Sequence, residues 1–298
     1  MKLNVLILAL PAFFAISLIA GCSGDKEIPA EPERIPLRIS TEMRTRASDS
    51  GYEKSDVVGI YVVNREDGTA AELKNSGNHL DNMDFTFDGT EWKAGKEVYW
   101  KDETTPADFY CYYPYRNGVT DVSAVPFGIV TDQGTVEKYK SGELLWGRAE
   151  GAAPSEDPVQ IMTNHALSKL VISVLPGKGY DDASLAQESI SVTVCGLRTG
   201  CSLDLRTGKV TETGSVGEIT PLKDGNVWKA LVVPQKVTDV ELVKLNVGGI
   251  PYSLVQTAVF ESGMQYSCSI KVNRLGEGVN IGIGEWEDSG IDYGGTVE

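Results

Sequence analysis

Histidine is nearly missing from this sequence, and familiar catalytic patterns are missing altogether. Only His79 and His165 occur among the 298 residues, and there is no G-x-S-x-G, P-loop, G-x-G-x-x-G or H-E-x-x-H pattern. A Ser-His-Asp site would have to use one of these two histidines. His165 stands beside Asn164 at the start of a strand-like run, where a structural role is the simpler interpretation. The sequence therefore predicts no catalytic residue and no enzymatic activity.

Cysteine is sparse and scattered. A zinc site requires ligands grouped in the sequence, and two distant histidines with dispersed cysteines do not supply them, so we expect no metal and no other cofactor. An exported protein can form disulfides. Cys195 and Cys201, which flank Gly196–Gly200, therefore form either a disulfide or two separate thiols. The remaining cysteines are Cys22, Cys111 and Cys268, and the last two have neighbours typical of a buried core.

Positive charge is also in short supply. Lys and Arg number 27 against 42 Asp and Glu, so the net charge is −15 at pH 7. A chain of this balance has little with which to displace counterions from phosphates, which argues against nucleic acid as a partner. It also argues against binding an anionic membrane surface through charge. The acidity keeps the protein soluble by mutual repulsion.

Long stretches with helical spacing are lacking, whereas alternating and turn-bounded apolar runs are frequent. Val57–Asn64 and Ala107–Tyr113 are predicted strands, and Gly248-Gly249 predicts a two-residue hairpin turn between alternating runs. Met264–Val272 alternates most clearly. We therefore expect an all-β protein made of two tandem β-sandwich domains.

The length fits two domains that each bury a core. Pro176–Gly179 interrupts the strand pattern and is the expected boundary. Pro114–Asp157 is expected to be long and irregular. The expected organisation is a segment 1–21, a tether 22–34, an N-terminal domain 35–176 and a C-terminal domain 177–298.

The chain begins with a segment typical of export. Lys2 precedes the nearly uninterrupted apolar run Leu3–Ala20, which ends in Ile19-Ala20-Gly21-Cys22. Small residues before a cysteine are what a lipoprotein signal peptidase requires, and the Cys22 thiol would accept a diacylglycerol. Two or more acyl chains anchor a protein stably. We expect residues 1–21 to be a lipoprotein signal peptide and Cys22 to bind the outer membrane, with the protein exposed at the cell surface.

The segment after the tether has the pattern of a strand at a sheet edge. Ile35, Leu37 and Ile39 alternate with Pro36, Arg38 and Ser40, and proline is tolerated at an edge or at a strand start. Arg44 and Arg46 follow in a polar stretch of the kind that proteases cut.

Aromatic residues are grouped in two places. The rings could form a platform on which sugars stack, but the alternation of Tyr110 and Tyr112 is equally typical of core packing. Both interpretations remain open for Trp92, Trp100, Tyr110, Tyr112, Tyr113 and Tyr115.

Several local patterns, in this order behind the lipobox, resemble the fimbrillin family of type V pilus subunits. The resemblance covers about residues 35 to 287. It is carried by Glu91-Trp92, Val98–Lys101, Phe109–Tyr115, Glu143–Ala149, Asn164–Leu170 and Leu231–Gln235.

The resemblance implies two tandem transthyretin-like, Greek-key β-sandwich domains behind a lipoprotein signal peptide. It implies a structural fimbrial subunit or accessory with a role in adhesion, whose partners are other fimbrial subunits and a host or bacterial surface ligand. In such proteins a protease cuts after an arginine and releases the first strand, and a neighbouring subunit fills the groove. Here Arg44 or Arg46 would be the cut site, and the displaced strand would carry Ile35, Leu37 and Ile39.

Two alternatives remain at this level. The protein could instead be a non-polymerising surface lipoprotein that binds a glycan or host protein through exposed aromatics. Among fimbrial roles, the sequence does not separate stalk, tip and anchor. Val279–Ile283 is either a donor strand or an ordinary last strand.

Overall fold

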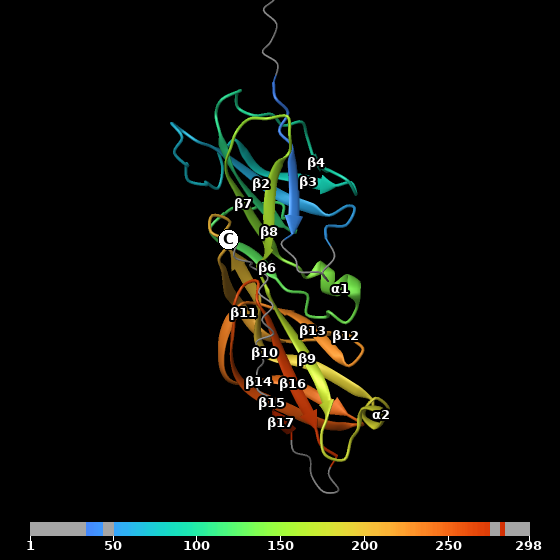
Figure 1. Cartoon of the computed structure of the whole chain (residues 1–298). Helices are drawn as coiled ribbons and strands as arrows, with labels where there is room; N and C mark the ends of the chain where they lie inside the picture. Colours follow the sequence, from blue (N-terminus) through green and yellow to red (C-terminus); the bar gives the residue numbers. More distant parts are fainter. Residues whose placement is uncertain (1–33, 44–50, 275–280, 284–298) are drawn as a thin grey trace, which may run out of the picture. The chain divides into compact units, whose positions relative to one another are not determined.

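The chain is all-β in the computed structural model, which describes residues 34–43, 51–274 and 281–283 (Figure 1). Its strands form three sheets. The described helices are short: α1 (Val136–Ser141) is capped by the Thr135 side chain, and α2 (Asp182–Leu185) by a capping box at Asp181. The expected all-β class is therefore confirmed.

The first sheet has seven strands in the order β1-β8-β7-β5-β2-β3-β4. β1 pairs with β8 in parallel, and the other neighbours are antiparallel. In Figure 1 the blue β1 lies beside β8 at one end of the sheet. The bounds are β1 (Ile39–Met43), β2 (Val57–Asn64), β3 (Leu80–Phe87), β4 (Trp92–Ala94), β5 (Ala107–Tyr113), β7 (Leu145–Ala152) and β8 (Val159–His165).

The central strands β2 and β5 are buried on both faces. One face contributes Ile60 and Phe109 to a core within this sheet. The opposite face contributes Tyr61 and Tyr110 to a larger core shared with the later strands. Alternate side chains of a strand point to opposite faces, so these strands need an apolar cover on each side.

The later strands form two five-stranded sheets that face each other across this larger core. One has the order β11-β10-β14-β15, with β6 also paired to β10, and the other has the order β12-β13-β9-β16-β17. The bounds are β6 (Val125–Gly128), β9 (Ser168–Pro176), β10 (Ile190–Leu203), β11 (Val210–Ile219), β12 (Leu222–Asp224), β13 (Val227–Val232), β14 (Gln235–Val247), β15 (Ile250–Phe260), β16 (Gln265–Val272) and β17 (Ile281–Ile283).

The strands of the later sheets begin before the expected domain boundary at 176/177. β9 ends at Pro176 but pairs with β13 and β16, so it belongs with the later strands. The region Pro114–Asp157 is more regular than expected, since it contains β6, α1 and β7. The hairpin at Gly248-Gly249 is confirmed: both glycines have positive φ (59° and 89°), as a type I′ turn requires.

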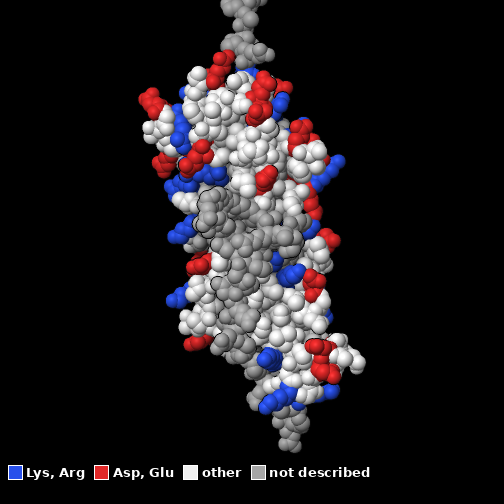
Figure 2. Space-filling model, viewed as in Figure 1, with Lys and Arg blue, Asp and Glu red and all other residues white. Residues whose placement is uncertain are grey.

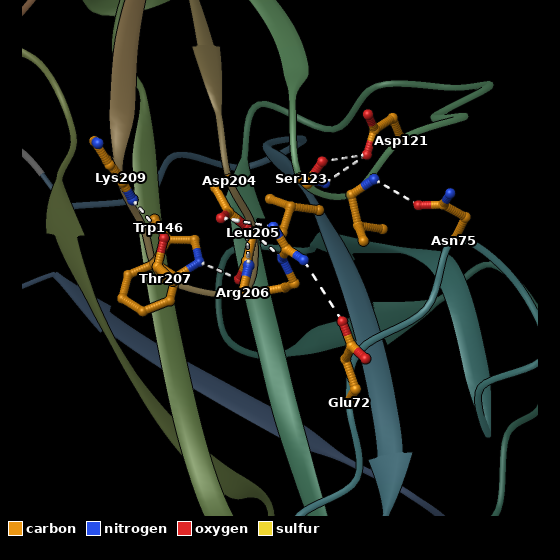
Figure 3. Close-up of polar contacts among 11 residues, drawn as sticks. Glu72, Asn75, Asp121, Ser123, Trp146, Asp204, Leu205, Arg206, Thr207 and Lys209 are labelled. Carbon is orange, nitrogen blue, oxygen red and sulfur yellow. Dashed lines mark hydrogen bonds and ion pairs between the residues drawn. The ribbon is translucent and has the colours of Figure 1, made fainter.

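A cluster of polar contacts joins the first sheet to the turn between β10 and β11 (Figure 3). The Trp146 indole N–H donates to the Leu205 carbonyl oxygen at 2.8 Å. The Arg206 guanidinium contacts Asp204 at 3.0 Å and Glu72 at 3.6 Å. Gly208 packs so closely on the Trp146 ring that an added Cβ would lie 2.5 Å from it. These contacts connect the seven-stranded sheet to the later sheets at a defined position.

Charged side chains are interspersed on the face seen in Figure 2, where acidic and basic groups alternate over the described residues. One carboxylate, in contrast, lies in the interior. Asp108 is fully buried in β5. It accepts hydrogen bonds from Arg65 Nε at 2.8 Å, Arg148 Nη2 at 3.2 Å and the Gly151 backbone N–H at 2.6 Å. Burial opposes ionisation, but these donors outweigh it and hold the pKa of Asp108 below its ordinary value.

We expect Asp108→Asn to lower the free energy of unfolding by about 3 kcal/mol at neutral pH, because two guanidinium groups lose their carboxylate. Because the folded-state pKa is depressed, this stabilisation is complete above the ordinary pKa of 3.8 and is lost as pH falls through the folded-state value. Urea denaturation of both proteins from pH 7 to pH 3 measures it. A difference that stays constant over this range would contradict the assignment.

Candidate functional site

The segment Arg34–Met43 lies between strands from two different parts of the first sheet. In its first half, Leu37 N–H donates to the Val98 carbonyl oxygen and Trp100 N–H donates to the Ile35 carbonyl oxygen, both at 3.0 Å. In its second half, β1 runs parallel to β8 from Ile39 opposite Val159 to Met43 opposite Thr163. Val98–Trp100 follows β4 at one end of the strand order, and β8 lies near the other. The segment therefore links the two ends of the sheet.

Side chains of this segment alternate as the sequence predicts. Leu37 and Ile39 are each 3% exposed and belong to the core of the first sheet, and Ile35 packs against that core half-buried. Arg38 is exposed. Burying an aliphatic side chain contributes about 1.5–3 kcal/mol, so the apolar side chains hold the segment together with its backbone hydrogen bonds. The expected edge strand is found only in part: β1 lies at the end of the strand order but covers Ile39–Met43, whereas Ile35 and Leu37 precede it and pair with Val98–Trp100.

Polar contacts fix the end of the segment. The Thr163 hydroxyl donates to the Glu42 carbonyl oxygen at 3.2 Å, and the Tyr52 hydroxyl donates to Thr163 Oγ1 at 2.9 Å. Burial raises the pKa of Tyr52 well above its ordinary value, so the phenol stays a donor. At the other end, the Arg34 guanidinium lies 4.4 Å from the centre of the Tyr99 ring.

The lipidation and cleavage residues predicted from the sequence lie outside the described residues. These are Cys22, Arg44 and Arg46. The structure does place Met43, the last residue of β1, directly before Arg44 in the chain. Val279 is outside as well, but Ile281–Ile283 forms β17, which pairs with β16 at the end of its sheet. Within the described chain, the first and the last strand are thus both edge strands.

The aromatic residues considered for sugar binding are mostly core residues. Trp92, Trp100, Tyr110 and Tyr112 are each less than 9% exposed, and Trp100 stacks edge-on against Phe109 with ring centres 5.5 Å apart. Core packing is confirmed for these four. Their ring faces are not accessible to a sugar, and Tyr113 and Tyr115 are half-buried.

Of the two alternatives for Cys195 and Cys201, the disulfide is excluded, because both are free, buried thiols. β10 runs through both residues as one strand, so their Cα atoms are roughly 20 Å apart, beyond the ~7 Å that a disulfide allows. Bulges near Gly196, whose φ is +72°, let the strand continue where the sequence suggests a loop. Burial raises the pKa of Cys201 to about 11, which makes this thiol unreactive.

Both histidines have structural contacts. His79 Nε2 lies 2.7 Å from the Tyr99 carbonyl oxygen, and His165 Nδ1 lies 2.9 Å from a Glu143 carboxylate oxygen. In the part of the chain that the structure describes, no group of three His, Cys, Asp or Glu could hold a metal ion. No helix among those residues is both long and apolar enough to span a membrane.

The known proteins that this sequence resembles have fimbrial descriptions. The sequence model of the family described as "Fimbrillin-like" matches residues 45–286. A protein of Bacteroides uniformis named "Putative fimbrium subunit Fim1C" is 27% identical over 305 residues, which cover 96% of each chain. A protein of Bacteroides ovatus named "Putative fimbrium tip subunit Fim1C" is 29% identical over 196 residues, which cover 57% of this chain and 35% of that one.

Solved structures share the fold. The crystal structure of a "putative cell adhesion protein" from Bacteroides uniformis has a TM-score of 0.63 at 22% identity, covering 86% of this chain and 97% of that chain. A second, from Bacteroides ovatus, has a TM-score of 0.66 at 17% identity, covering 86% and 98%. At these identities the likeness concerns the fold.

We expect Leu37→Ala to lower the free energy of unfolding of the uncut chain by about 2–5 kcal/mol, because it leaves a cavity beneath the first sheet. The neighbouring exposed residue provides the matched control: Arg38→Ala should change it by less than about 0.5 kcal/mol. Urea denaturation measures both variants. Equal effects of the two substitutions would show that the segment does not complete the core.

Proposed function

The chain belongs to the fimbrillin-like family, and from this premise we propose that it is a fimbrial subunit matured by release of its first strand. It works at the cell surface as a structural protein. The finer fold that we propose is a pair of tandem transthyretin-like β-sandwich domains. The observation that carries the maturation step is the placement of Ile35, Leu37 and Ile39 in a segment that completes a core and whose second half, β1, is an edge strand.

Release of this segment opens a groove of the kind that an incoming strand can fill. The groove presents the Val98 carbonyl oxygen and the Trp100 N–H on one side and the backbone of β8 on the other. Leu37 and Ile39 leave apolar sites next to Ile161. A strand with alternating apolar residues restores both the hydrogen bonds and the burial. The groove is thus a receptor for another fimbrial subunit.

Cleavage after Arg44 or Arg46 is the step that makes release irreversible. Before the cut, the segment is held by covalent connection as well as by pairing, and a displaced strand returns. Arg34 and Arg38 are poor alternatives, because the Arg38 carbonyl oxygen accepts a hydrogen bond from Val159 N–H at 2.9 Å and Arg34 stacks on Tyr99. A protease must first draw the backbone out of such pairing. The polar stretch after Met43 is the better substrate.

The lipid on Cys22 serves delivery. Residues 1–21 direct export, and the acylated Cys22 holds the precursor at the outer membrane. A cut at Arg44 or Arg46 separates Cys22 from the rest of the chain, so the same event frees the subunit from the membrane and opens its groove.

The donor for a neighbouring subunit is the C-terminal end of the chain. In the described part of the chain, β17 is an edge strand that pairs with β16 through Ile270–Ile283, Lys271–Gly282 and Val272–Ile281. An edge strand leaves its sheet at a lower free-energy cost than a central strand, because it is paired on one side only. This supports β17 as a releasable strand.

We expect the surface-assembled form to begin at Thr45 or Ala47, which N-terminal sequencing of isolated fimbriae determines. Arg44→Lys combined with Arg46→Lys keeps both charges but removes both arginines, so this variant should remain lipid-anchored and unassembled. Arg38→Lys is the control and should mature normally. A surface form that begins at Cys22 would remove the maturation step from this account.

A further inference from the structure

β15 is a long edge strand whose outer side has no strand beside it in the described part of the chain. It pairs with β14 alone in the strand order (Figure 1). Val255 and Val259 are 54% and 49% exposed. Their solvent-facing row continues through Ser253 and Thr257, which are also exposed, while Leu254 and the other alternate residues face inward.

The residues of β15 after Pro251 lack the charges and the proline that usually prevent edge-to-edge pairing, although β14 behind them bulges between Val237 and Val240 and between Glu241 and Val243. The sequence of β15, IPYSLVQTAVF, contains no charged residue, although the chain as a whole is 23% charged. Edge strands normally carry lysine, a bulge or inward charges that block an added strand. At the opposite edge of the same sheet, β11 does carry Glu212 and Glu218. β15 is therefore suited to accept a strand.

Backbone geometry determines which groups of β15 are available. Val247 and Ile250 close the two-residue hairpin and form a hydrogen-bonded pair, so the even-numbered residues of β15 direct their N–H and C=O groups toward β14. The odd-numbered residues from Ser253 to Val259 then direct theirs outward. Pro251 has no N–H and weakens any register that uses it.

We propose that β15 pairs with β15 of a second copy, antiparallel and about a twofold axis through Thr257. In this register, Val255 of each copy lies opposite Val259 of the other. The two Thr257 side chains lie opposite each other at the axis. Apolar and Thr–Thr cross-strand pairs each contribute favourably. A twofold axis through Val255 would instead bring Pro251 opposite Val259.

Flanking charges favour the same register. On β14, Lys236 is paired with Val259 and Glu241 with Val255, and both charged residues are exposed. Across the twofold axis, Lys236 of one copy lies in the row that ends at Glu241 of the other. Opposite signs therefore stand at the two ends of each of these rows. The central row differs, because the exposed Asp239 is hydrogen-bonded to Thr257 Oγ1 in each copy. The occupant that fits is a second copy of this chain.

Cysteine crosslinking of the full-length chain tests the register. Thr257→Cys places two thiols opposite each other, with Cα atoms at about 5.5 Å, within the range of a disulfide. Mild air oxidation should then give a covalent dimer on a non-reducing gel. The unmodified chain sets the background, because Cys111, Cys195, Cys201 and Cys268 are buried and Cys22 is present in every variant.

Matched variants make the test specific. Val216→Cys, on β11, is 58% exposed and should give no dimer above background. Val255→Cys alone should also fail, since its twofold mate is about 13 Å away along the strand, whereas Val255→Cys combined with Val259→Cys should crosslink. Adding Val259→Lys to Thr257→Cys should weaken association about tenfold.

Two outcomes would overturn the proposal. One is a Thr257→Cys dimer no stronger than that of Val216→Cys. The other is a crosslink from Thr257→Cys to a different protein, which would make the edge a site for another partner. Loss of β15 pairing leaves the cut near Arg44 unaffected, so this test is independent of maturation.

Discussion

Burial of both faces of β2 and β5 is the constraint on which the structure depends. A strand with apolar residues on both faces cannot be stable with one face in water. Tyr61 and Tyr110 are covered by the larger core that includes the later sheets, and Ile60 and Phe109 by the core that Leu37 and Ile39 complete. The two cores differ in one respect. The core around Ile60 and Phe109 is completed by a short segment near the start of the chain.

That difference is the basis of the proposed assembly. An edge strand can be removed without breaking the ladders between the remaining strands, whereas a central strand cannot. Removal of Ile35–Met43 exposes apolar sites and unpaired backbone groups together, and the free-energy cost of leaving both in water favours a replacement strand. The contacts of Trp146 with Leu205 and of Arg206 with Glu72 connect the first sheet to the later ones without involving this segment.

Local patterns predicted much of this structure. Val57–Asn64 and Ala107–Tyr113 are strands with the predicted bounds, and the Gly248-Gly249 turn is where the sequence places it. The alternating burial of Leu37 and Ile39 was also predictable. Patterns failed where pairing is nonlocal: β9 joins later strands, and β10 continues through Gly196 because a bulge there keeps it paired with its neighbours. The burial of Asp108 could not be predicted from the sequence, because its arginine partners are distant in the chain.

The sequence by itself determined the all-β class, the apolar face of the first strand and the order of motifs that resembles fimbrillins, because side-chain period and turn chemistry are local properties. Only the tertiary structure decided which strands lie at edges. β1 pairs in parallel with β8, whose Val159 is far along the chain, and β15 has β14 alone as a described neighbour. Strand neighbours depend on long-range burial and backbone pairing, which no short stretch of sequence contains.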